Sequence, residues 1–268
     1  MYFETKNTNW VGDIAYWDGT KVKTVPSDKY YSSMGSPIGV VVIPEGFAPD
    51  GKTRIVSLYG VDITGNKVSL NVSMKWGPIN TDTSLTNYTK VPTTDNNGST
   101  STGSSGYGYL PSDKFTGSTS FVDPQTKYYG STPYIPSPYL GNNPNPEYYK
   151  TLNGNNILSD FNGLNNTKTL VNLGSDYQAA NAAWKYKDGS SNLQWYLPGI
   201  GELGYLISRL KKINNTINVL NGIYLVNSGF WSSSEGDSKN AYNVGTGDGN
   251  TYSYSKTHRF YVRPFAII

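Results

Sequence analysis

The sequence contains no cysteine, and His258 is its single histidine. Without cysteine the chain can form no disulfide, thiolate nucleophile, iron–sulfur cluster or cysteine-ligated zinc site. One histidine cannot supply a multi-histidine metal site. We therefore expect no metal ion and no other cofactor.

Charged residues and long apolar runs are also scarce. Asp, Glu, Lys and Arg make up 15% of the 268 residues, and 22 basic against 19 acidic side chains leave a net charge of +3. No basic run offers an electrostatic footprint for nucleic acid or an anionic membrane surface. No apolar stretch approaches the roughly 18 residues of a membrane span, and residues 1–10 lack the features of a secretion signal. We expect neither a nucleic-acid partner nor membrane insertion.

Glycine, tyrosine and small polar residues fill the chain instead. It holds 29 glycines and 23 tyrosines, and its hydrophobic fraction is 36%. Such residues form turns, short strands and hydrogen-bonding surfaces but few long helices. The composition argues against a helical bundle, and the length suits one elaborated domain or two small ones.

Strand patterns dominate the first third of the chain. Residues 39–43 and 54–58 are β-branched runs separated by the turn residues 49–51, which predicts a hairpin. Residues 68–76 alternate apolar and polar side chains, as expected of a strand with one buried face.

Helical periodicity follows only after residue 165, at 178–186 and 199–213. The C-terminal part then returns to strand-like segments at 230–231, 252–254, 260–262 and 265–268. Strands, two helices and strands again form an α+β order rather than a regular βαβ alternation. We expect the core to include Trp195, Leu203, Trp231 and Val262.

The middle of the chain has a composition of its own. Residues 93–108 have almost nothing to bury, which predicts an exposed loop or a flexible linker. Residues 128–149 are rich in tyrosine and proline, which predicts a long ordered insertion. Its tyrosines either pack flat on a core face or form a platform on which a ligand stacks.

Three chemical motifs carry little functional signal. Residues 199–204 match GxGxxG, but Pro198 interrupts the turn and no acidic residue follows about 20 positions on, so we expect a closely packed helix start with Glu202 favoured by the helix dipole. His258 is expected to be a surface histidine rather than a general base. The carboxylates are scattered, so a glycosidase-like pair stays open as an alternative.

The most informative region is 236–261. It consists mostly of Gly, Ser, Thr, Asn, Asp and Tyr, the residues from which antibody-like binding surfaces are built. Composition alone fits either a recognition surface or an exposed β-meander with ordinary turns.

Several short blocks together resemble a known family. They are Gly-Asp-Ile at 12–14, Ile-Gly-Val-Val-Val at 38–42, Arg-Ile-Val-Ser-Leu at 54–58, Trp-Gly at 76–77, Trp-Tyr-Leu-Pro at 195–198 with Glu202-Leu203, Trp-Ser-Ser-Ser-Glu at 231–235 and Val-Arg-Pro at 262–264. The chain is similar to C-type-lectin-fold proteins related to formylglycine-generating enzymes, common in gut Bacteroidetes and their phages. It most resembles the variable proteins of diversity-generating retroelements.

The resemblance implies one α+β C-type-lectin-like domain over residues 1–268, with short antiparallel strands and two helices. It places a Tyr/Pro/Gly-rich insertion at about 93–149 and a variable ligand-binding region at about 230–263. In that family a reverse transcriptase mutates template adenines, and the substituted residues form the exposed ligand-binding face. Asn-type template codons do not yield Lys, so Lys239 and Lys256 would be fixed positions.

By this match the expected variable, ligand-binding residues are Gly236, Asp237, Ser238, Asn240, Tyr242, Asn243, Thr246, Asp248, Asn250, Tyr252, Tyr254, Thr257, His258 and Phe260.

Two departures from relatives narrow the chemistry. The enzymes of the family need cysteines, so formylglycine chemistry is excluded. Calcium-dependent lectins use Glu-Pro-Asn-like and Trp-Asn-Asp-like ligand sets; residues 145–147 reverse the first and the second is missing, so calcium-mediated sugar binding is not expected.

The resemblance implies a non-enzymatic receptor-binding protein, which we place first at the tail tip of a phage. A bacterial surface adhesin or pilus-tip protein of the same fold is the first alternative, and a carboxylate-dependent glycan-degrading enzyme is the second. The expected partner is a protein or glycan of a bacterial cell surface, and assembly of several copies would add avidity.

Overall fold

The computed structural model describes residues 9–48, 50–83, 85, 160–207, 209–226, 228–246 and 251–268. The expected linker at 93–108 and insertion at 93–149 lie outside the described residues. The helices described are α2 Gly163–Leu173, α3 Gln178–Lys185, α4 Ile200–Ile207 and α5 Leu210–Val219, with short 3-10 helices at Ser27–Lys29 and Ser32–Met34. The strands are β1 Ile14–Trp17, β2 Val22–Val25, β3 Ser36–Ile43, β4 Arg54–Ser57, β5 Gly60–Val61, β6 Lys67–Val68, β7 Ser73–Lys75, β8 Trp195–Tyr196, β9 Gly229–Glu235, β10 Asn240–Gly245, β11 Thr251–Ser255, β12 Arg259–Tyr261 and β13 Phe265–Ile267.

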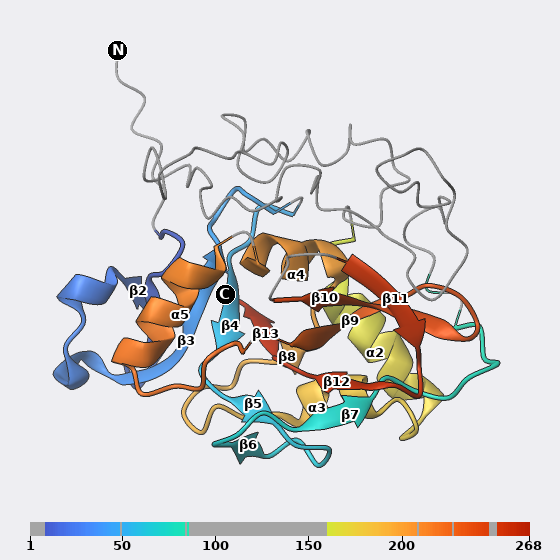
Figure 1. The fold of residues 1–268 in the computed structure, drawn as a ribbon. Coiled ribbons are helices and arrows are strands. Elements are labelled where there is room, and N and C mark those ends of the chain that lie inside the picture. The colour runs from blue at the N-terminus through green and yellow to red at the C-terminus, as the bar shows by residue number, and fades with distance from the viewer. Residues whose placement is uncertain are drawn as a thin grey trace, which may run out of the picture.

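A six-stranded antiparallel sheet has the order β2-β1-β3-β4-β13-β8 (Figure 1). The predicted hairpin of residues 39–43 and 54–58 is confirmed, because β3 and β4 pair with Val40 opposite Val56. The C-terminal strand β13 lies inside the sheet, between β4 and β8. Its central place explains why the end of the chain is apolar and buried at Phe265 and Ala266.

A five-stranded sheet has the order β11-β10-β9-β12-β7, and the small β5–β6 pair stands apart. Within the five-stranded sheet β9 and β12 are parallel, and the other neighbours are antiparallel. This sheet carries the region 236–261 that the sequence singles out.

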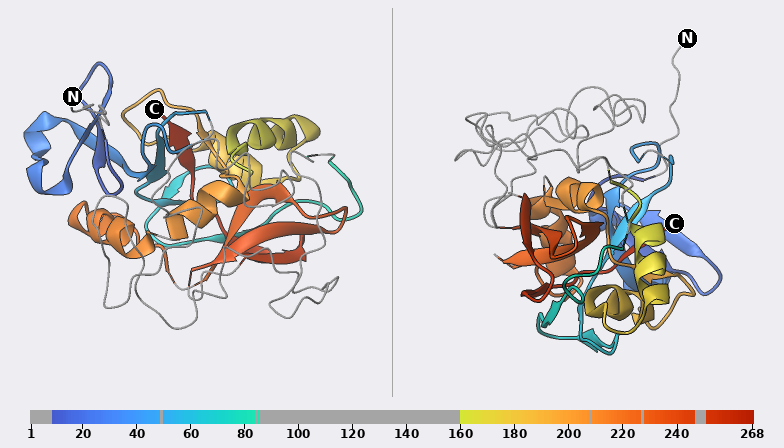
Figure 2. Two further views of the ribbon diagram at one scale, coloured as in Figure 1. Left: turned by 90° about the horizontal axis from the view of Figure 1, so that it is seen from above. Right: turned by 90° about the vertical axis from the view of Figure 1, so that its right-hand side faces the viewer.

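The helices fill the space on and between the sheets (Figure 2). The helices α2 and α3 pack on each other and contact β8 and β9, whereas α4 contacts both β3 and β9 and so bridges the two sheets. The buried hydrophobic residues form two clusters, and one of them holds the fully buried Trp76, Trp195 and Trp231. The predicted core residues Leu203 and Val262 are also buried, at 1% exposure each.

The α+β class is confirmed, but the expected number of two helices is wrong: the described residues hold four α-helices. The helix expected at 199–213 is two helices, because the backbone of Arg209 leaves helical geometry at φ −126° and ψ 15°. The Arg209 side chain is buried over the ring of Tyr205, 3.8 Å from its centroid.

The α2 helix escapes prediction because its sequence, rich in Asn and Thr, has weak intrinsic propensity. Long-range contacts hold it: the Thr167 hydroxyl donates to the Leu197 carbonyl at 3.0 Å. The strand expected at 68–76 is likewise wrong, since it splits into β6 and β7. Between them Leu70 is 76% exposed and the Asn71 amide donates to the Tyr224 carbonyl.

The glycine motif at 199–204 supports packing, as expected. A Cβ at Gly199 would lie 2.4 Å from the Asp160 carbonyl oxygen, so only glycine fits. The preceding strand β8 pairs antiparallel with β13, in contrast to the parallel strands of a dinucleotide-binding unit.

Candidate functional site

An aromatic patch lies on the five-stranded sheet and consists of Tyr252, Tyr254, His258 and Phe260. The two tyrosines are two positions apart on β11 and share a face, and the turn after β11 returns the chain so that β12 adds Phe260. Tyr254 lies 5.2 Å from both His258 and Phe260, measured between ring centroids. His258 is exposed and lies 4.5 Å from Phe260, and the other three rings are half-buried.

The patch rests on a fixed base. Phe260 meets the fully buried Trp231 edge to face at 4.8 Å. The Trp231 indole N–H donates to the Met74 carbonyl at 2.9 Å, which ties the ring to strand β7. The inner edge of the patch is therefore continuous with the core, and its outer edge at His258 meets solvent.

Polar residues of the β9–β10 turn form a second group of predicted positions. Asp237 Oδ1 accepts the backbone N–H groups of Lys239 and Asn240, and the Asn240 amide donates to Asp237. Both side chains are half-buried, as are Gly236 and Ser238. Asp237 and Asn240 therefore shape this turn as well as presenting polar atoms beside the sheet.

Three predicted binding residues are buried, which corrects the expectation that they lie on an exposed face. Tyr242, Asn243 and Thr246 are 7%, 1% and 9% exposed. Tyr242 and Asn243 lie on β10, an interior strand that α4 also contacts, and Thr246 directly after it donates its hydroxyl to the Ser228 carbonyl at 3.1 Å. Burial raises the pKa of Tyr242 to about 12.

Of the remaining predicted positions, one is exposed and two lie outside the described residues. Thr257 is exposed, and its hydroxyl lies 2.9 Å from that of Ser255. Asp248 and Asn250 lie outside the described residues. The structure thus gathers the aromatic positions into one patch, places the polar turn on the same sheet, and buries Tyr242, Asn243 and Thr246.

The two lysines of the region have opposite environments. Lys239 is exposed, whereas Lys256 is fully buried. The Lys256 ammonium pairs with Glu235 and donates to the Thr81 carbonyl at 2.6 Å. Glu235 in turn accepts from the Thr83 hydroxyl at 2.7 Å, so this ion pair fastens both turns of the candidate region to residues 81–83.

The Trp-Ser-Ser-Ser-Glu block is structural. The Ser234 hydroxyl donates to Asp160 at 2.5 Å and accepts the Ile200 N–H at 3.0 Å. Burial raises the pKa of Asp160, and the hydrogen bonds from Ser234 and Asn166 act against that rise. These serines fix β9 to the start of α4, which the sequence alone did not reveal.

Glu202 lies in the first turn of α4, as expected, and forms a second buried polar cluster there. It is fully buried and accepts from Arg54 Nε at 3.1 Å and from the Tyr196 hydroxyl at 2.8 Å. It also accepts the Gly199 N–H at 2.8 Å. Burial raises the pKa of Glu202 to about 7, although Arg54 and these hydrogen bonds oppose the rise.

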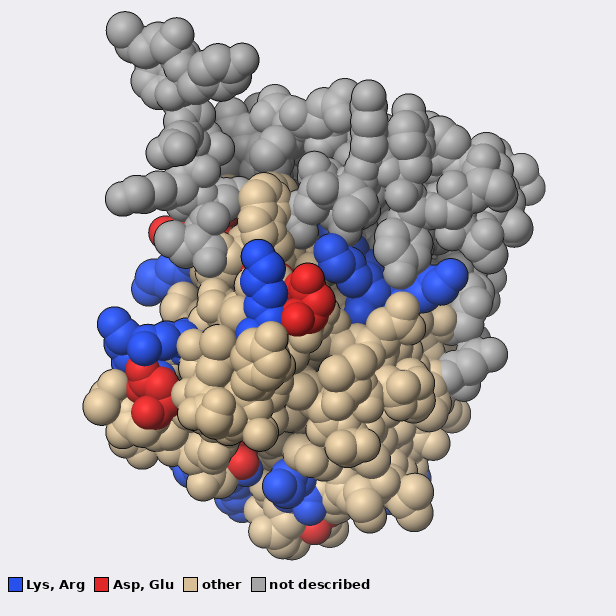
Figure 3. All heavy atoms as spheres, turned by 90° about the vertical axis from the view of Figure 1, so that its left-hand side faces the viewer, with Lys and Arg blue, Asp and Glu red and all other residues tan. Residues whose placement is uncertain are grey.

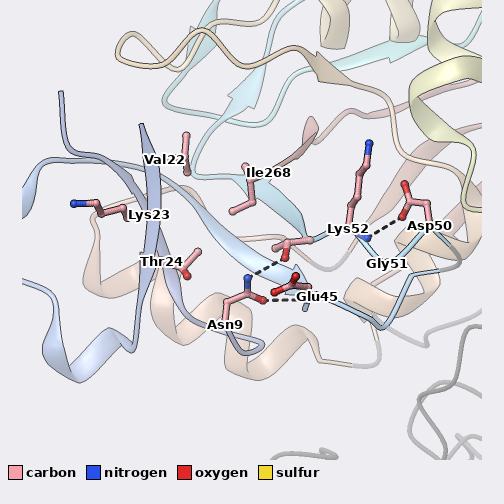
Figure 4. A pocket seen from close by; sticks show the side chains of 10 residues that line it. Asn9, Val22, Lys23, Thr24, Glu45, Asp50, Gly51, Lys52 and Ile268 are labelled. Carbon is pink, nitrogen blue, oxygen red and sulfur yellow. Dashed lines mark hydrogen bonds between the residues drawn. The ribbon is translucent and has the colours of Figure 1, made fainter. Parts of the chain in front are cut away.

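An open cavity of about 420 Å³ lies at the six-stranded sheet (Figure 4). Glu45 and Asp50 are its carboxylates, but Asp50 is already bound by Arg54 at 2.7 Å. The lining residues are Asn9, Val22, Lys23, Thr24, Glu45, Asp50, Gly51, Lys52, Thr53 and Ile268.

Charged side chains of both signs are interspersed on the end of the molecule that carries β2 and α5 (Figure 3).

The described residues offer neither a metal site nor a membrane-spanning helix. Among them, no group of three or more His, Asp or Glu side chains is placed to hold a metal ion. No helix in the same residues has the length and apolarity needed to cross a bilayer.

Comparison with known proteins adds one structural likeness. No family model matches the chain, and no curated protein matches it. A crystal structure of a fimbrial protein from Bacteroides ovatus is similar, with a TM-score of 0.52 and 18% sequence identity. The match covers 97% of this chain and 49% of the fimbrial protein, so the chain spans about half of that protein's length. At this identity the likeness shows a shared fold.

Proposed function

We propose that the chain is a non-enzymatic binding module of adhesin type, displayed on the surface of a bacterial cell. The observation that carries the proposal is the aromatic patch, whose rings meet solvent at His258 and rest on Trp231. Tyrosine-rich patches of this kind give large contact areas at small entropic cost.

The support beneath the patch favours binding rather than catalysis. Glu235, at the end of β9, is buried in an ion pair with Lys256, and Asp237 in the region itself is bound by the backbone N–H groups of its own turn. A rigid base under half-exposed rings is what a binding surface requires, because less conformational entropy is lost when a ligand docks.

The fimbrial likeness supports placing the module on a bacterial surface rather than at the tail tip of a phage. Fimbriae carry many copies of their subunits, and display in many copies raises the avidity of a weak site by about 10²–10⁴. A bacterial or host surface protein or glycan is the partner class that suits such display.

A C-type-lectin fold diversified by a retroelement is the finer part of the proposal. The block order from Gly12 to Pro264 supports it, as does the lack of Glu, Gln, Met and Trp within 236–261. The burial of Lys256 suits a fixed scaffold position within a variable region. Sequencing this gene across its source population tests the idea: substitutions clustered at adenine-bearing codons within 236–260 are expected, and a uniform 3′ end would rule out diversification.

The binding proposal is tested with two patch variants, Tyr254→Ala and His258→Ala, against the exposed control Lys239→Ala. Purified protein is applied to a glycan array and to panels of bacterial and host cells. We expect each patch variant to lose at least about tenfold in affinity, the effect of removing an aromatic contact residue, while the control binds as wild type. Equal binding by all variants would overturn the assignment of the site, and release of reducing sugars from the array would indicate an enzyme.

A further inference from the structure

In the part of the chain that the structure describes, the strand β11 is the outermost strand of the five-stranded sheet. Among the described residues no strand pairs with its outer side, and its sequence Thr-Tyr-Ser-Tyr-Ser contains neither a charge nor proline. Proteins usually protect exposed edges with lysine, proline or a very short strand, because open edges recruit other strands. The edge strand β2 carries Lys23, and β7 is only three residues long with Lys75. The other edge, β8, is two fully buried residues.

The register fixes which backbone groups of β11 point outward. The Lys256 N–H donates to the Lys239 carbonyl, and Asn240 stands opposite Ser255. Backbone groups alternate in direction along an antiparallel pair, so Tyr252 and Tyr254 bond to β10, whereas Ser253 and Ser255 turn away. The Asn240 carbonyl agrees with this register, since it accepts N–H groups from the turn at 236–237 on the other side of β10.

The outward groups have the pattern that another strand requires. The Ser255 carbonyl accepts the His258 N–H at 2.8 Å. Within the described residues nothing bonds to the outward N–H and C=O of Ser253, which stand at the middle of the strand. A donor and an acceptor from one residue are what an incoming extended backbone satisfies in pairs.

We propose that β11 binds an extended segment of a partner protein by strand addition, so that the segment becomes the next strand of the five-stranded sheet. The proposal rests on the proposed function, because the same segment would lie against the aromatic patch, and it narrows the ligand from protein or glycan to protein. A glycan presents hydroxyl groups but no regular row of amide donors and acceptors.

The side chains beside the edge define what the segment carries. Tyr252 and Tyr254 lie on one face of β11 and Ser253 on the other. Every second residue of the added strand would therefore meet tyrosine rings, which favours apolar or aromatic residues there. The residues between them would lie beside Ser253 and are best small and uncharged. A run of about five such residues matches the length of the edge.

The test uses random linear peptides of about ten residues, displayed on yeast and selected with the full chain. Enriched peptides are synthesised and their affinities measured for wild type, Ser253→Pro and Ser253→Ala. Proline removes the outward N–H without touching the bonds to β10, and such a change is tolerated on an edge strand. Alanine removes only the hydroxyl and serves as the matched control.

We expect the Ser253→Pro variant to bind at least about tenfold more weakly, because one backbone hydrogen bond is lost and the peptide carbonyl that it served is left unpaired. The Ser253→Ala variant should stay within about twofold, a fraction of one hydrogen bond. Amide hydrogen exchange of the wild-type complex supplies a readout that needs no variant. The Ser253 amide should become protected when the peptide binds, even if the proline variant does not fold.

The outcomes distinguish failure of the strand-addition proposal from failure of the proposed function. Enriched peptides that leave the Ser253 amide unprotected, or that bind Ser253→Pro as wild type, would overturn strand addition. Failure to enrich any peptide would also overturn it, while glycan or cell binding lost in Tyr254→Ala would leave the proposed function standing. If the binding of peptides, glycans and cells were all unchanged in Tyr254→Ala and His258→Ala, both the strand-addition proposal and the proposed function would be overturned.

Discussion

Replacing Lys256 with methionine tests whether the buried ion pair holds the candidate binding region in place. Methionine keeps the length of the side chain but removes the ammonium group that pairs with Glu235 and donates to the Thr81 carbonyl. The Glu235 carboxylate, 1% exposed, would then lie buried without its cation.

The expected loss is about 3–5 kcal/mol of unfolding free energy, the range measured when one partner of a buried pair is removed. Domains are stable by only about 5–15 kcal/mol, so this is a large fraction of the total. For a chain of this size the loss corresponds to a fall in Tm of roughly 6–20 °C. Urea unfolding followed by tryptophan fluorescence measures it directly.

Two controls separate charge from shape. Lys239 belongs to the same region but is exposed, so Lys239→Met should change stability by no more than about 0.5 kcal/mol. The double variant Lys256→Met with Glu235→Gln removes both charges and should recover more than half of the loss. A loss below about 1 kcal/mol in Lys256→Met, or equal losses for the two lysines, would refute the argument that this pair anchors the region.

Two further stability measurements probe the buried Trp231 ring and the buried Glu202 carboxyl. Trp231→Ala should cost roughly 3–5 kcal/mol because the ring is fully buried under Phe260; a loss under about 1 kcal/mol in the same urea assay would contradict its role as the base of the patch. The Glu202 carboxyl keeps its proton up to about pH 7 in the folded chain but only to its ordinary value of 4.5 when unfolded. Its contribution is therefore complete below pH 4.5 and falls as the pH rises toward 7, by about 3 kcal/mol. In Glu202→Gln this part of the pH dependence should vanish, which urea titrations at pH 5 and pH 8 would reveal.

The sequence predicted the parts of the fold in which local pattern and tertiary environment agree. Residues 39–43 form a strand by propensity and lie in the interior of a sheet, and residues 178–186 have an alanine stripe that α3 buries. The local sequence pattern failed to predict the structure where residues distant in the sequence determine the backbone conformation. The α2 helix is held by Asp160, Leu197 and Ser233 rather than by its own weak propensity.

The candidate site shows the same division. The family resemblance named Tyr252, Tyr254, His258 and Phe260 among its candidate positions, and the structure brings these four rings together on the five-stranded sheet. The resemblance did not reveal that β10 is an interior strand, because a single sequence does not state strand order. Tyr242 and Asn243 have the same polar or amphipathic character as Tyr252 and Asn240, but they lie on an interior strand that α4 contacts, and both are buried.

This difference between strands makes a prediction about which positions can vary. A diversified position must accept many side chains, and exposed substitutions usually change stability by no more than about 0.5 kcal/mol. Asn243 lies opposite Trp231 in the ladder and is 1% exposed, so larger side chains there would overpack the core at a cost of about 1–3 kcal/mol.

Site-saturation libraries at Asn243 and at Thr257, sorted for folded protein displayed on yeast, compare the two environments directly. Most substitutions at the exposed Thr257 should survive sorting, and few should survive at Asn243. If the two libraries retained equal diversity, β10 would have to be as tolerant as the surface, and burial would no longer distinguish scaffold from binding face in this sheet. If they differ as expected, natural variants of this gene should keep Tyr242, Asn243 and Thr246 even where residues of the aromatic patch change. The reason is that only the patch can vary without unfolding the strand beneath it.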